Sequence, residues 1–210
     1  MGDGAAFVSW FERMYPERSS ELGVLLEYGE LVRRGNPRLG LVSRGDLDRL
    51  HTRHLQECLA PELLDVVPEG AALIDVGSGG GMPGIPLAVM RRDVRVTLLE
   101  PRQKKAAFLD RCGLLLNLRV PVIVKTLEEL ARSEGAAHWD VATSRGIRWT
   151  PGLAACLSKV IVEEGTLIRF GAPHPGVPGV RSVTLQDSLA PRAIQSWPRN
   201  TWVELHKAEQ

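Results

Sequence analysis

The residues of this chain best suited to chemistry lie in one short segment, where an acid is followed by a glycine-rich turn. The apolar run Ala72–Val76 contains Asp75, and five glycines and two prolines follow between residues 77 and 86. Glycine lets the backbone turn tightly and approach a ligand closely, because it has no Cβ. Proline suits the first turn of a helix, where its missing N–H is not needed. A strand that leads through such a turn into a helix is typical of a cofactor-binding site.

Two acids indicate which cofactor this site takes. The segment Gly79–Gly84 also matches the G-x-G-x-x-G pattern of dinucleotide sites, with Gly79 and Gly81 as its first two glycines. A carboxylate at Asp75 would repel a pyrophosphate but attract the ammonium and sulfonium of S-adenosylmethionine. Glu100 closes the next apolar run and can accept hydrogen bonds from both ribose hydroxyls. We therefore predict S-adenosylmethionine; the alternative is a glycine-rich turn with two solvated acids.

Two further positions follow later strands. Leu127 and Glu128 come after the third predicted strand, where Glu128 or a nearby backbone N–H could bond the adenine. Acids also favour the first turn of any helix, which is the simpler explanation. Arg145 ends the fourth predicted strand, where the methyl acceptor approaches, and could hold a phosphate or a base edge. The alternative for Arg145 is a surface arginine that pairs with an acid.

Basic residues gather in two places. Residues 31–54 hold six arginines against two acids, and a second group follows Glu100. Such clusters fit contacts with RNA phosphates, although a solvated helix face is the alternative for any single arginine. The predicted RNA-binding residues are Arg33, Arg34, Arg38, Arg44, Arg53, Lys104 and Lys105. His54 falls on the apolar side of its predicted helix, so a satisfied core histidine is an equally good interpretation.

No catalytic dyad is evident in the sequence. The chain has no His-Glu-x-x-His, no G-x-S-x-G and no Asn-Pro-Pro-Tyr motif. The three cysteines are far apart and form no C-x-x-C pair, so neither a zinc site nor a disulfide framework is indicated. An acceptor that is already nucleophilic, such as guanine N7, needs from the enzyme only correct positioning and a favourable electrostatic environment in a desolvated site. Arg145 is then the candidate catalytic residue.

Length and composition limit the class of protein. The 210 residues, 44% hydrophobic, suffice for one core and a small appendage. The net charge of +1 means that any nucleic-acid surface must be a local patch. No basic flank with an apolar core opens the chain, and no run is long enough to span a membrane, so we expect a cytoplasmic protein. We also expect a monomer without a metal.

Hydrophobic periodicity divides the chain at about residue 68. Residues 1–68 predict a helical cap, with apolar stripes over 7–14 and 22–32, a breaker-rich loop over 33–40 and a helix over 46–59. From residue 69 to 210 strands alternate with helices, which indicates a mostly parallel sheet. Predicted strands are 71–76, 94–99, 120–124, 139–144 and 165–170, and predicted helices are 84–92, 102–116, 127–134 and 151–162. After a loop at 172–179, residues 180–186 and 201–206 predict antiparallel strands. The fold class is α/β, Rossmann-like.

The motif Asp75–Ala88 resembles the first motif of the bacterial 16S ribosomal RNA guanine-N7 methyltransferases, the methyltransferase G or glucose-inhibited division protein B family. Its Gly-Met-Pro-Gly-Ile-Pro part is specific, because general methyltransferases lack it. Four more stretches agree with that family in order and spacing: Arg53–Leu59, Leu98–Leu109, Leu127–Glu128 and Thr143–Gly146. The resemblance covers about residues 20–171.

The resemblance implies a Rossmann-like S-adenosylmethionine-dependent methyltransferase with an N-terminal helical cap. It assigns cofactor contacts to Gly77, Met82, Leu127, Glu128 and Arg145, and the second-strand acid to Glu100. The implied acceptor is a guanine in the decoding-region loop of 16S rRNA, as bare RNA or in the small ribosomal subunit.

The chain departs from that family in its acceptor-facing half. Gly40–Val42 replaces Asn-Leu-Thr, Glu57-Cys58 replaces Asp-Ser, and Phe170-Gly171 replaces Lys-Gly. A methyltransferase acting on another RNA or a small molecule, or a non-catalytic cofactor- or RNA-binding paralogue, therefore remains as an alternative.

Overall fold

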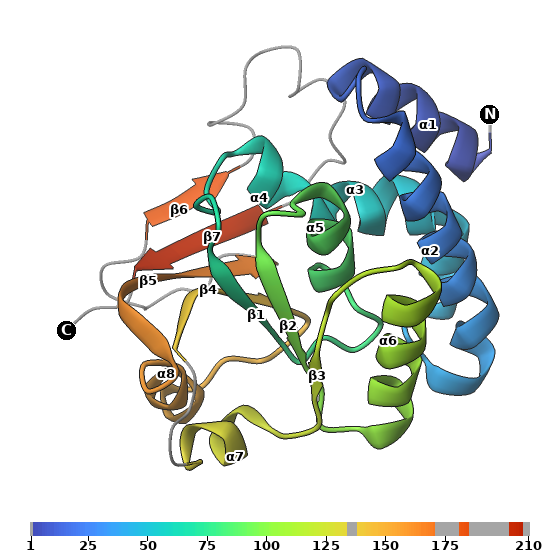
Figure 1. Cartoon of the computed structure of the whole chain (residues 1–210). Coiled ribbons are helices and arrows are strands. Elements are labelled where there is room, and N and C mark those ends of the chain that lie inside the picture. The colour runs from blue at the N-terminus through green and yellow to red at the C-terminus, as the bar shows by residue number, and fades with distance from the viewer. Residues whose placement is uncertain (1, 134–137, 171–180, 185–201, 208–210) are drawn as a thin grey trace.

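A twisted sheet forms the centre of the computed structural model, which describes residues 2–133, 138–170, 181–184 and 202–207. The described strands form a seven-stranded sheet in the order β3-β2-β1-β4-β5-β7-β6 (Figure 1). Its strands are β1 (Ala72–Val76), β2 (Arg95–Leu99), β3 (Val122–Ile123), β4 (Trp139–Arg145), β5 (Ile161–Phe170), β6 (Arg181–Thr184) and β7 (Trp202–Lys207). The expected mostly parallel α/β architecture is confirmed.

The strand order reverses direction between β1 and β4. The chain passes outward from β1 to β2 and β3, then returns to place β4 and β5 on the other side of β1, all in parallel. In such sheets ligands bind outside the carboxyl ends of the strands at this switch point. Asp75 lies there, opposite Leu98 of β2 and Thr143 of β4.

Side chains of β1 alternate between two hydrophobic layers. Leu73 packs among α5 (Gly84–Met90), α6 (Gln103–Leu115) and the N-terminal helices. Ile74 packs on the other face with α7 (Leu127–Ala131) and α8 (Pro151–Leu157). Figure 1 shows these two layers on opposite sides of the sheet.

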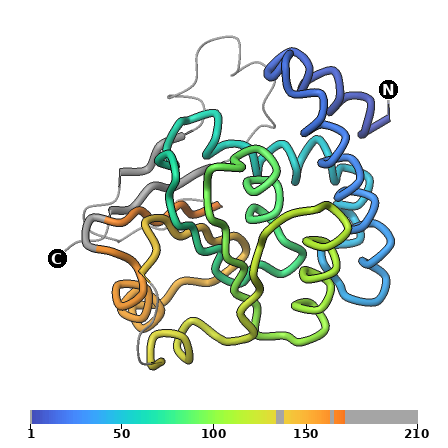
Figure 2. The backbone as a smooth tube through the Cα atoms, viewed as in Figure 1, coloured from blue at the N-terminus to red at the C-terminus, as the bar shows by residue number. Residues whose placement is uncertain are grey.

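The N-terminal part contains α1 (Asp3–Met14) and α2 (Ser19–Leu39), so the loop predicted over residues 33–40 is wrong. Helix α2 continues through Pro37, and it ends at Gly40, which adopts φ +58°. The glycine at position 35 allows close packing rather than breaking the helix: an added Cβ would lie 3.0 Å from the Phe108 ring of α6. The tube view shows α2 running beside α6 (Figure 2).

Asn36 explains how α2 can end so abruptly. Its buried side-chain oxygen accepts hydrogen bonds from the backbone N–H groups of Leu41, at 2.7 Å, and Val42, at 2.8 Å. A loop interpretation based on Gly, Asn and Pro misses this, because the same residues can also end a helix.

The helix expected over residues 46–59 is present but irregular. It consists of the 3₁₀ helix η1 (Arg44–Arg49), the π-helix η2 (Leu50–Leu55) and the short α3 (Gln56–Cys58), followed by α4 (Ala60–Leu63). The cap, defined here as residues 3–63, shares one hydrophobic cluster with β1, α5 and α6. The proposed domain boundary at residues 68/69 stays a prediction.

The remaining predicted elements differ mainly in length. Helix α8 ends at Leu157 rather than at 162, and β5 begins at Ile161 rather than at 165. Strands β6 and β7 pair antiparallel, as predicted for the tail. The predicted loop at 172–179 lies outside the described residues. Among the described helices, none is both long and apolar enough to cross a membrane.

Candidate active site

Asp75 is buried at the switch point with both carboxylate oxygens engaged. Oδ1 accepts a hydrogen bond from the Thr143 hydroxyl at 2.8 Å, and Oδ2 accepts one from the Gly84 N–H at 3.2 Å. Burial raises the pKa of Asp75 to about 6, although these two hydrogen bonds favour the charged form. The carboxyl therefore joins β1, β4 and the start of α5. Because the Asp75 carboxyl is buried, its predicted attraction of the cofactor must act through the intervening Thr143 and Gly84 groups.

The turn after β1 depends on backbone conformations that favour glycine. Gly77, Gly79 and Gly81 have φ values of +67°, +57° and +95°. An added Cβ at Gly77 would lie 2.5 Å from Ile147, so the loop after β4 closes directly on this glycine. At Gly79 the nearest atom would be 3.7 Å away, which leaves space beside this part of the turn.

Glu100 lies at the carboxyl end of β2 and faces the same turn. Its Oε2 accepts a hydrogen bond from the Gly79 N–H at 2.8 Å, and its Oε1 accepts one from the Arg102 N–H at 2.9 Å. The structure thus brings together the two elements that the sequence predicted to bind one cofactor. Each carboxylate oxygen can accept more than one hydrogen bond, so these contacts leave room for ribose hydroxyls.

The cap holds the turn from the opposite side through residues that sequence reasoning missed. The fully buried Tyr28 donates a hydrogen bond from its hydroxyl to the Gly80 carbonyl at 2.6 Å. Leu41 packs over the same glycine, 3.2 Å from an added Cβ, and Met82 is buried beside it. Tyr28 falls within the predicted apolar stripe over residues 22–32, and the sequence gives no signal that its hydroxyl has a distant partner.

Leu127 and Glu128 differ in exposure. Leu127 is buried, whereas Glu128 is exposed in the first turn of α7. The neighbouring Glu129 forms a capping box with Thr126, so its carboxylate is used by the helix itself. Glu128 is therefore the acid of this pair that can face a ligand.

Arg145 connects the end of β4 to the cap. Its guanidinium donates to the Glu57 carboxylate at 2.9 Å and closely contacts Nδ1 of His54. Burial, reinforced by the Arg145 charge, lowers the pKa of His54 to about 4, so the imidazole is neutral near pH 7. Its Nε2 lies 3.5 Å from Asp46 without a hydrogen bond. Arg145 thus pairs with an acid, as its alternative interpretation expects, but its side chain is largely buried rather than on the surface.

The cysteine beside this group is unsuited to nucleophilic chemistry. Cys58 is fully buried, and burial raises the pKa of its thiol to about 12. A thiolate is the nucleophilic form of cysteine, so Cys58 packs as an apolar residue. Cys112 is buried with a similarly raised pKa, and all three cysteines are free. In the part of the chain that the structure describes, no group of three potential ligands could hold a metal.

The predicted RNA-binding residues fall into two groups. Arg33 pairs with Asp3, and Arg53 pairs with Asp46, so their charges are compensated within the cap. Lys105 donates to the Gly40 carbonyl at 3.1 Å. The exposed members are Arg34, Arg38, Arg44 and Lys104. Arg34 and Arg38 belong to α2, Arg44 to η1 and Lys104 to the first turn of α6.

Comparison with known proteins assigns the family. Residues 22–172 match the model of the GidB family, rRNA small subunit methyltransferase G. The chain belongs to this family. It is 34% identical over 146 residues to the ribosomal RNA small subunit methyltransferase G of Ruegeria sp. (strain TM1040), covering 68% of each chain. The corresponding protein of Streptomyces avermitilis is 41% identical over 123 residues, which are 58% of this chain and 50% of that relative. The match to the Thermobifida fusca protein covers 60% of that relative.

Solved structures confirm the fold class. A structure of MtNAS in complex with MTA and tNA has a TM-score of 0.58 at 18% identity, covering 90% of this chain and 72% of that one. A mutant of MtNAS in complex with S-adenosylmethionine has a TM-score of 0.56 at 19% identity, with 90% and 74% coverage. At this identity the likeness shows the fold alone.

The predicted membership of the methyltransferase G family is confirmed by the family match over residues 22–172.

The raised pKa of Asp75 predicts a pH-dependent effect of Asp75→Asn. The pKa of Asp75 is about 6 in the folded state and 3.8 in the unfolded state, so folding favours the protonated carboxyl. The stability that this protonated form contributes is fully present below pH 3.8 and is lost as the pH rises through about 6. Because one pKa unit equals about 1.4 kcal/mol, the wild type should lose about 3 kcal/mol relative to Asp75→Asn between pH 3.5 and 7. The asparagine can still accept from Gly84 and donate to the Thr143 hydroxyl.

Urea unfolding of both proteins at several pH values measures this difference. A gap between the two free energies of unfolding that stays constant with pH would contradict the assignment of the raised pKa to Asp75.

Proposed function

We propose that this protein transfers a methyl group from S-adenosylmethionine to N7 of a guanine in 16S rRNA, as bare RNA or in the small ribosomal subunit. The observation that carries this proposal is the glycine-rich turn at the β1/β4 switch point, with Glu100 bonded to it, in a chain of the methyltransferase G family. We further propose that the protein acts in the cytoplasm as a monomer. No metal takes part in this proposed reaction.

The residues at the turn fit the proposed cofactor. An added Cβ at Gly79 would meet only the Gly77 carbonyl, at 3.7 Å, so no side chain packs on this glycine and a ligand could approach its backbone. Glu100 would hold the ribose hydroxyls, and the exposed Glu128 would face the adenine. Asp75, Gly77, Gly81, Met82 and Leu127 would shape the turn and its floor.

Methylation of guanine N7 makes few chemical demands on the protein. When bound, S-adenosylmethionine supplies an electrophilic methyl group on a sulfonium. Guanine N7 carries a lone pair and no proton, so the new N–C bond forms as the S–C bond breaks, without a general base. The protein must orient the base in line with the methyl group and exclude water. The neutral His54 and the buried thiol of Cys58 are consistent with a site that moves no proton.

Replacement of Glu100 tests the cofactor site. Glu100→Ala removes a charged acceptor worth about 1.5–3 kcal/mol, so S-adenosylmethionine affinity should fall by about 10- to 150-fold. Calorimetry with S-adenosylmethionine and S-adenosylhomocysteine measures this, with the exposed Glu69→Ala as a control of equal charge change. Unchanged affinity in a folded Glu100→Ala variant would remove Glu100 from the site. Tight binding of a nicotinamide dinucleotide, with no binding of either adenosyl ligand, would overturn the assignment of S-adenosylmethionine as the cofactor.

Transfer of labelled methyl groups to small subunits and to bare 16S rRNA tests the reaction. We expect a product mapped to guanine N7 and an RNA affinity that falls steeply with salt, because each neutralised phosphate releases counterions. Joint replacement of Arg34, Arg38 and Arg44 by glutamine should raise the KM for RNA at constant cofactor affinity. Salt-independent acceptor binding would favour a small molecule, and RNA binding without turnover would favour a non-catalytic paralogue.

Arg145 is proposed to orient the acceptor over the methyl group. Arg145→Ala should then lower kcat by about 100-fold while cofactor affinity changes little, since orientation is the term lost. Arg145→Lys keeps the charge but not the planar fork and should recover only part of the rate. Glu57→Ala breaks the ion pair to the cap but keeps Arg145. If Glu57→Ala lowers kcat as much as Arg145→Ala does, Arg145 acts by holding the cap.

A further inference from the structure

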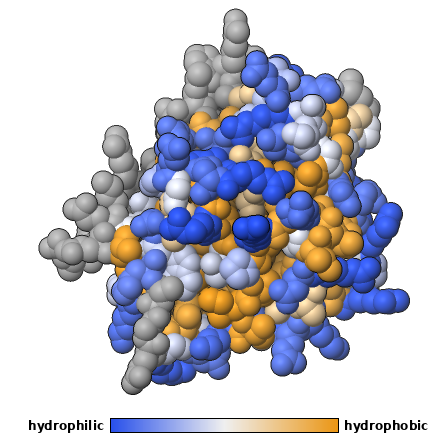
Figure 3. All heavy atoms as spheres, in the orientation of Figure 1, coloured by the Kyte–Doolittle hydropathy of each residue, from blue (hydrophilic) through white to orange (hydrophobic). Residues whose placement is uncertain are grey.

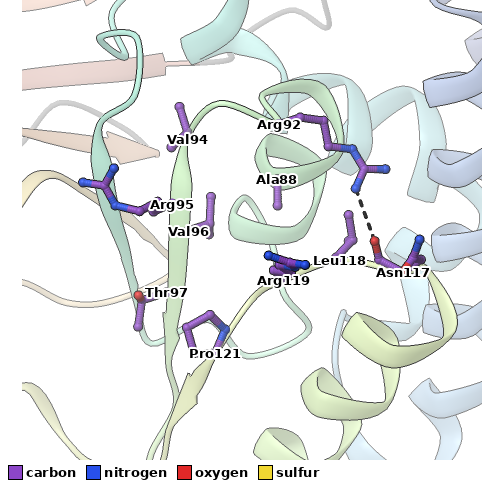
Figure 4. A pocket seen from close by; sticks show the side chains of 10 residues that line it. All are labelled: Ala88, Arg92, Val94, Arg95, Val96, Thr97, Asn117, Leu118, Arg119 and Pro121. Carbon is purple, nitrogen blue, oxygen red and sulfur yellow. Dashed lines mark hydrogen bonds between the residues drawn. The ribbon is translucent and has the colours of Figure 1, made fainter.

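An arginine-lined cavity lies at the opposite end of β2 from the glycine-rich turn. It has a volume of about 620 Å³, within the roughly 300–1,000 Å³ typical of ligand sites. Its walls come from the end of α5, the outer edge of β2 and the segment after α6 (Figure 4). The lining residues are Ala88, Arg92, Val94, Arg95, Val96, Thr97, Asn117, Leu118, Arg119 and Pro121. This set contains three cations and no acid.

The cavity exists because β3 is short. Among the described strands, β3 pairs with β2 only at Leu98 and Leu99, so the outer edge of β2 is open from Arg95 to Thr97. Val94 and Val96 provide an apolar floor. On the face drawn in Figure 3, strongly hydrophilic residues lie beside hydrophobic ones across this part of the molecule.

None of the three arginines forms an ion pair among the described residues, although Arg92 interacts with the Glu21 carboxylate at longer range. Arg92 donates to the Asn117 carbonyl at 3.3 Å and Arg95 to the Gly70 carbonyl at 2.9 Å, whereas neither these two nor Arg119 has a carboxylate within ion-pair distance among the described residues. A guanidinium has five donors, so one bond to a neutral carbonyl leaves most of them available. All three side chains belong to exposed residues.

The neighbouring acid does not cancel this charge. Asp93 is bound by the Arg91 guanidinium at 2.7 Å and by the Gly70 N–H at 3.1 Å. Its pKa is held far below its ordinary value, mainly by the hydrogen bond from Arg91. Arg91 and Asp93 thus neutralise one another. The positive potential of the cavity comes from Arg92, Arg95 and Arg119.

We infer that this cavity binds the sugar–phosphate backbone of the RNA substrate at a second contact, separate from the methyl-transfer site. Guanidinium groups bind phosphate, and Figure 4 shows Arg92 and Arg95 extending to opposite sides with Arg119 between them, which suits an extended backbone rather than a single phosphate. The apolar floor can cover a sugar or base face. Five residues of strand separate Arg95 from Glu100, or about 17 Å, so the RNA would extend over several nucleotides along β2. This inference rests on the proposed RNA methylation.

A triple variant tests the second contact. Arg92→Gln, Arg95→Gln and Arg119→Gln are combined and compared with a triple of equal charge change, Arg13→Gln, Arg132→Gln and Lys159→Gln, at exposed positions elsewhere. Binding to bare 16S rRNA is measured as a function of salt. In the cavity variant, Kd should rise about tenfold or more, and the slope of log K against log salt should decrease by about 2–3. The control triple should match the wild type.

Further measurements separate folding from binding. S-adenosylmethionine affinity and kcat at saturating RNA should stay within about twofold of the wild type, which shows an intact methyl-transfer site. Should the triple fail to fold, Arg119→Gln alone should reduce the salt slope by about 1.

The possible failures are distinguishable. Absence of RNA methylation by the wild type would overturn the proposed function. If the wild type methylates RNA but the cavity variant keeps the wild-type Kd and salt slope, this inference alone is overturned. A cavity variant that loses activity only on assembled small subunits, with unchanged binding to bare RNA, would assign the cavity to a protein partner and also overturn it.

Discussion

The candidate site depends on one constraint: a turn made largely of glycines must be held in place by groups outside it. Glycine permits the positive φ values at Gly77, Gly79 and Gly81, but it also leaves the turn with the greatest conformational freedom to lose. Hydrogen bonds from outside the turn offset this entropy. Glu100 binds the Gly79 N–H, and Tyr28 binds the Gly80 carbonyl. Rigidity of the proposed cofactor site is therefore a property of the whole fold.

The same constraint explains why the cap shares its core with the sheet. Tyr28 reaches Gly80 only because α2 packs directly on α5 and α6, and Arg145 reaches Glu57 because α3 lies over the end of β4. The cap thus contacts both the turn and the strand end where the acceptor is proposed to approach. Loosening of the cap is expected to affect cofactor binding and acceptor placement together.

The positive charges of the chain are divided between internal ion pairs and exposed surface. Arginines of the cap form internal ion pairs: Arg33 pairs with Asp3, and Arg53 pairs with Asp46. Among the exposed cations, one group comes from α2, η1 and α6, and another lines the cavity at the open edge of β2. Because the net charge is only +1, these local areas would supply the positive potential that the proposed RNA binding requires.

The sequence by itself determined the elements whose signals are local. The alternation of strands and helices, the glycine-rich turn after Asp75 and the acid at Glu100 all follow from periodicity and from the properties of glycine. Only the tertiary structure decided which side chains have distant partners. The helix through Pro37, the bond from Tyr28 to Gly80 and the pairing of Arg145 with Glu57 each depend on contacts between remote segments. Such contacts leave no local pattern, because burial and hydrogen-bond geometry arise only when the layers of the fold come together.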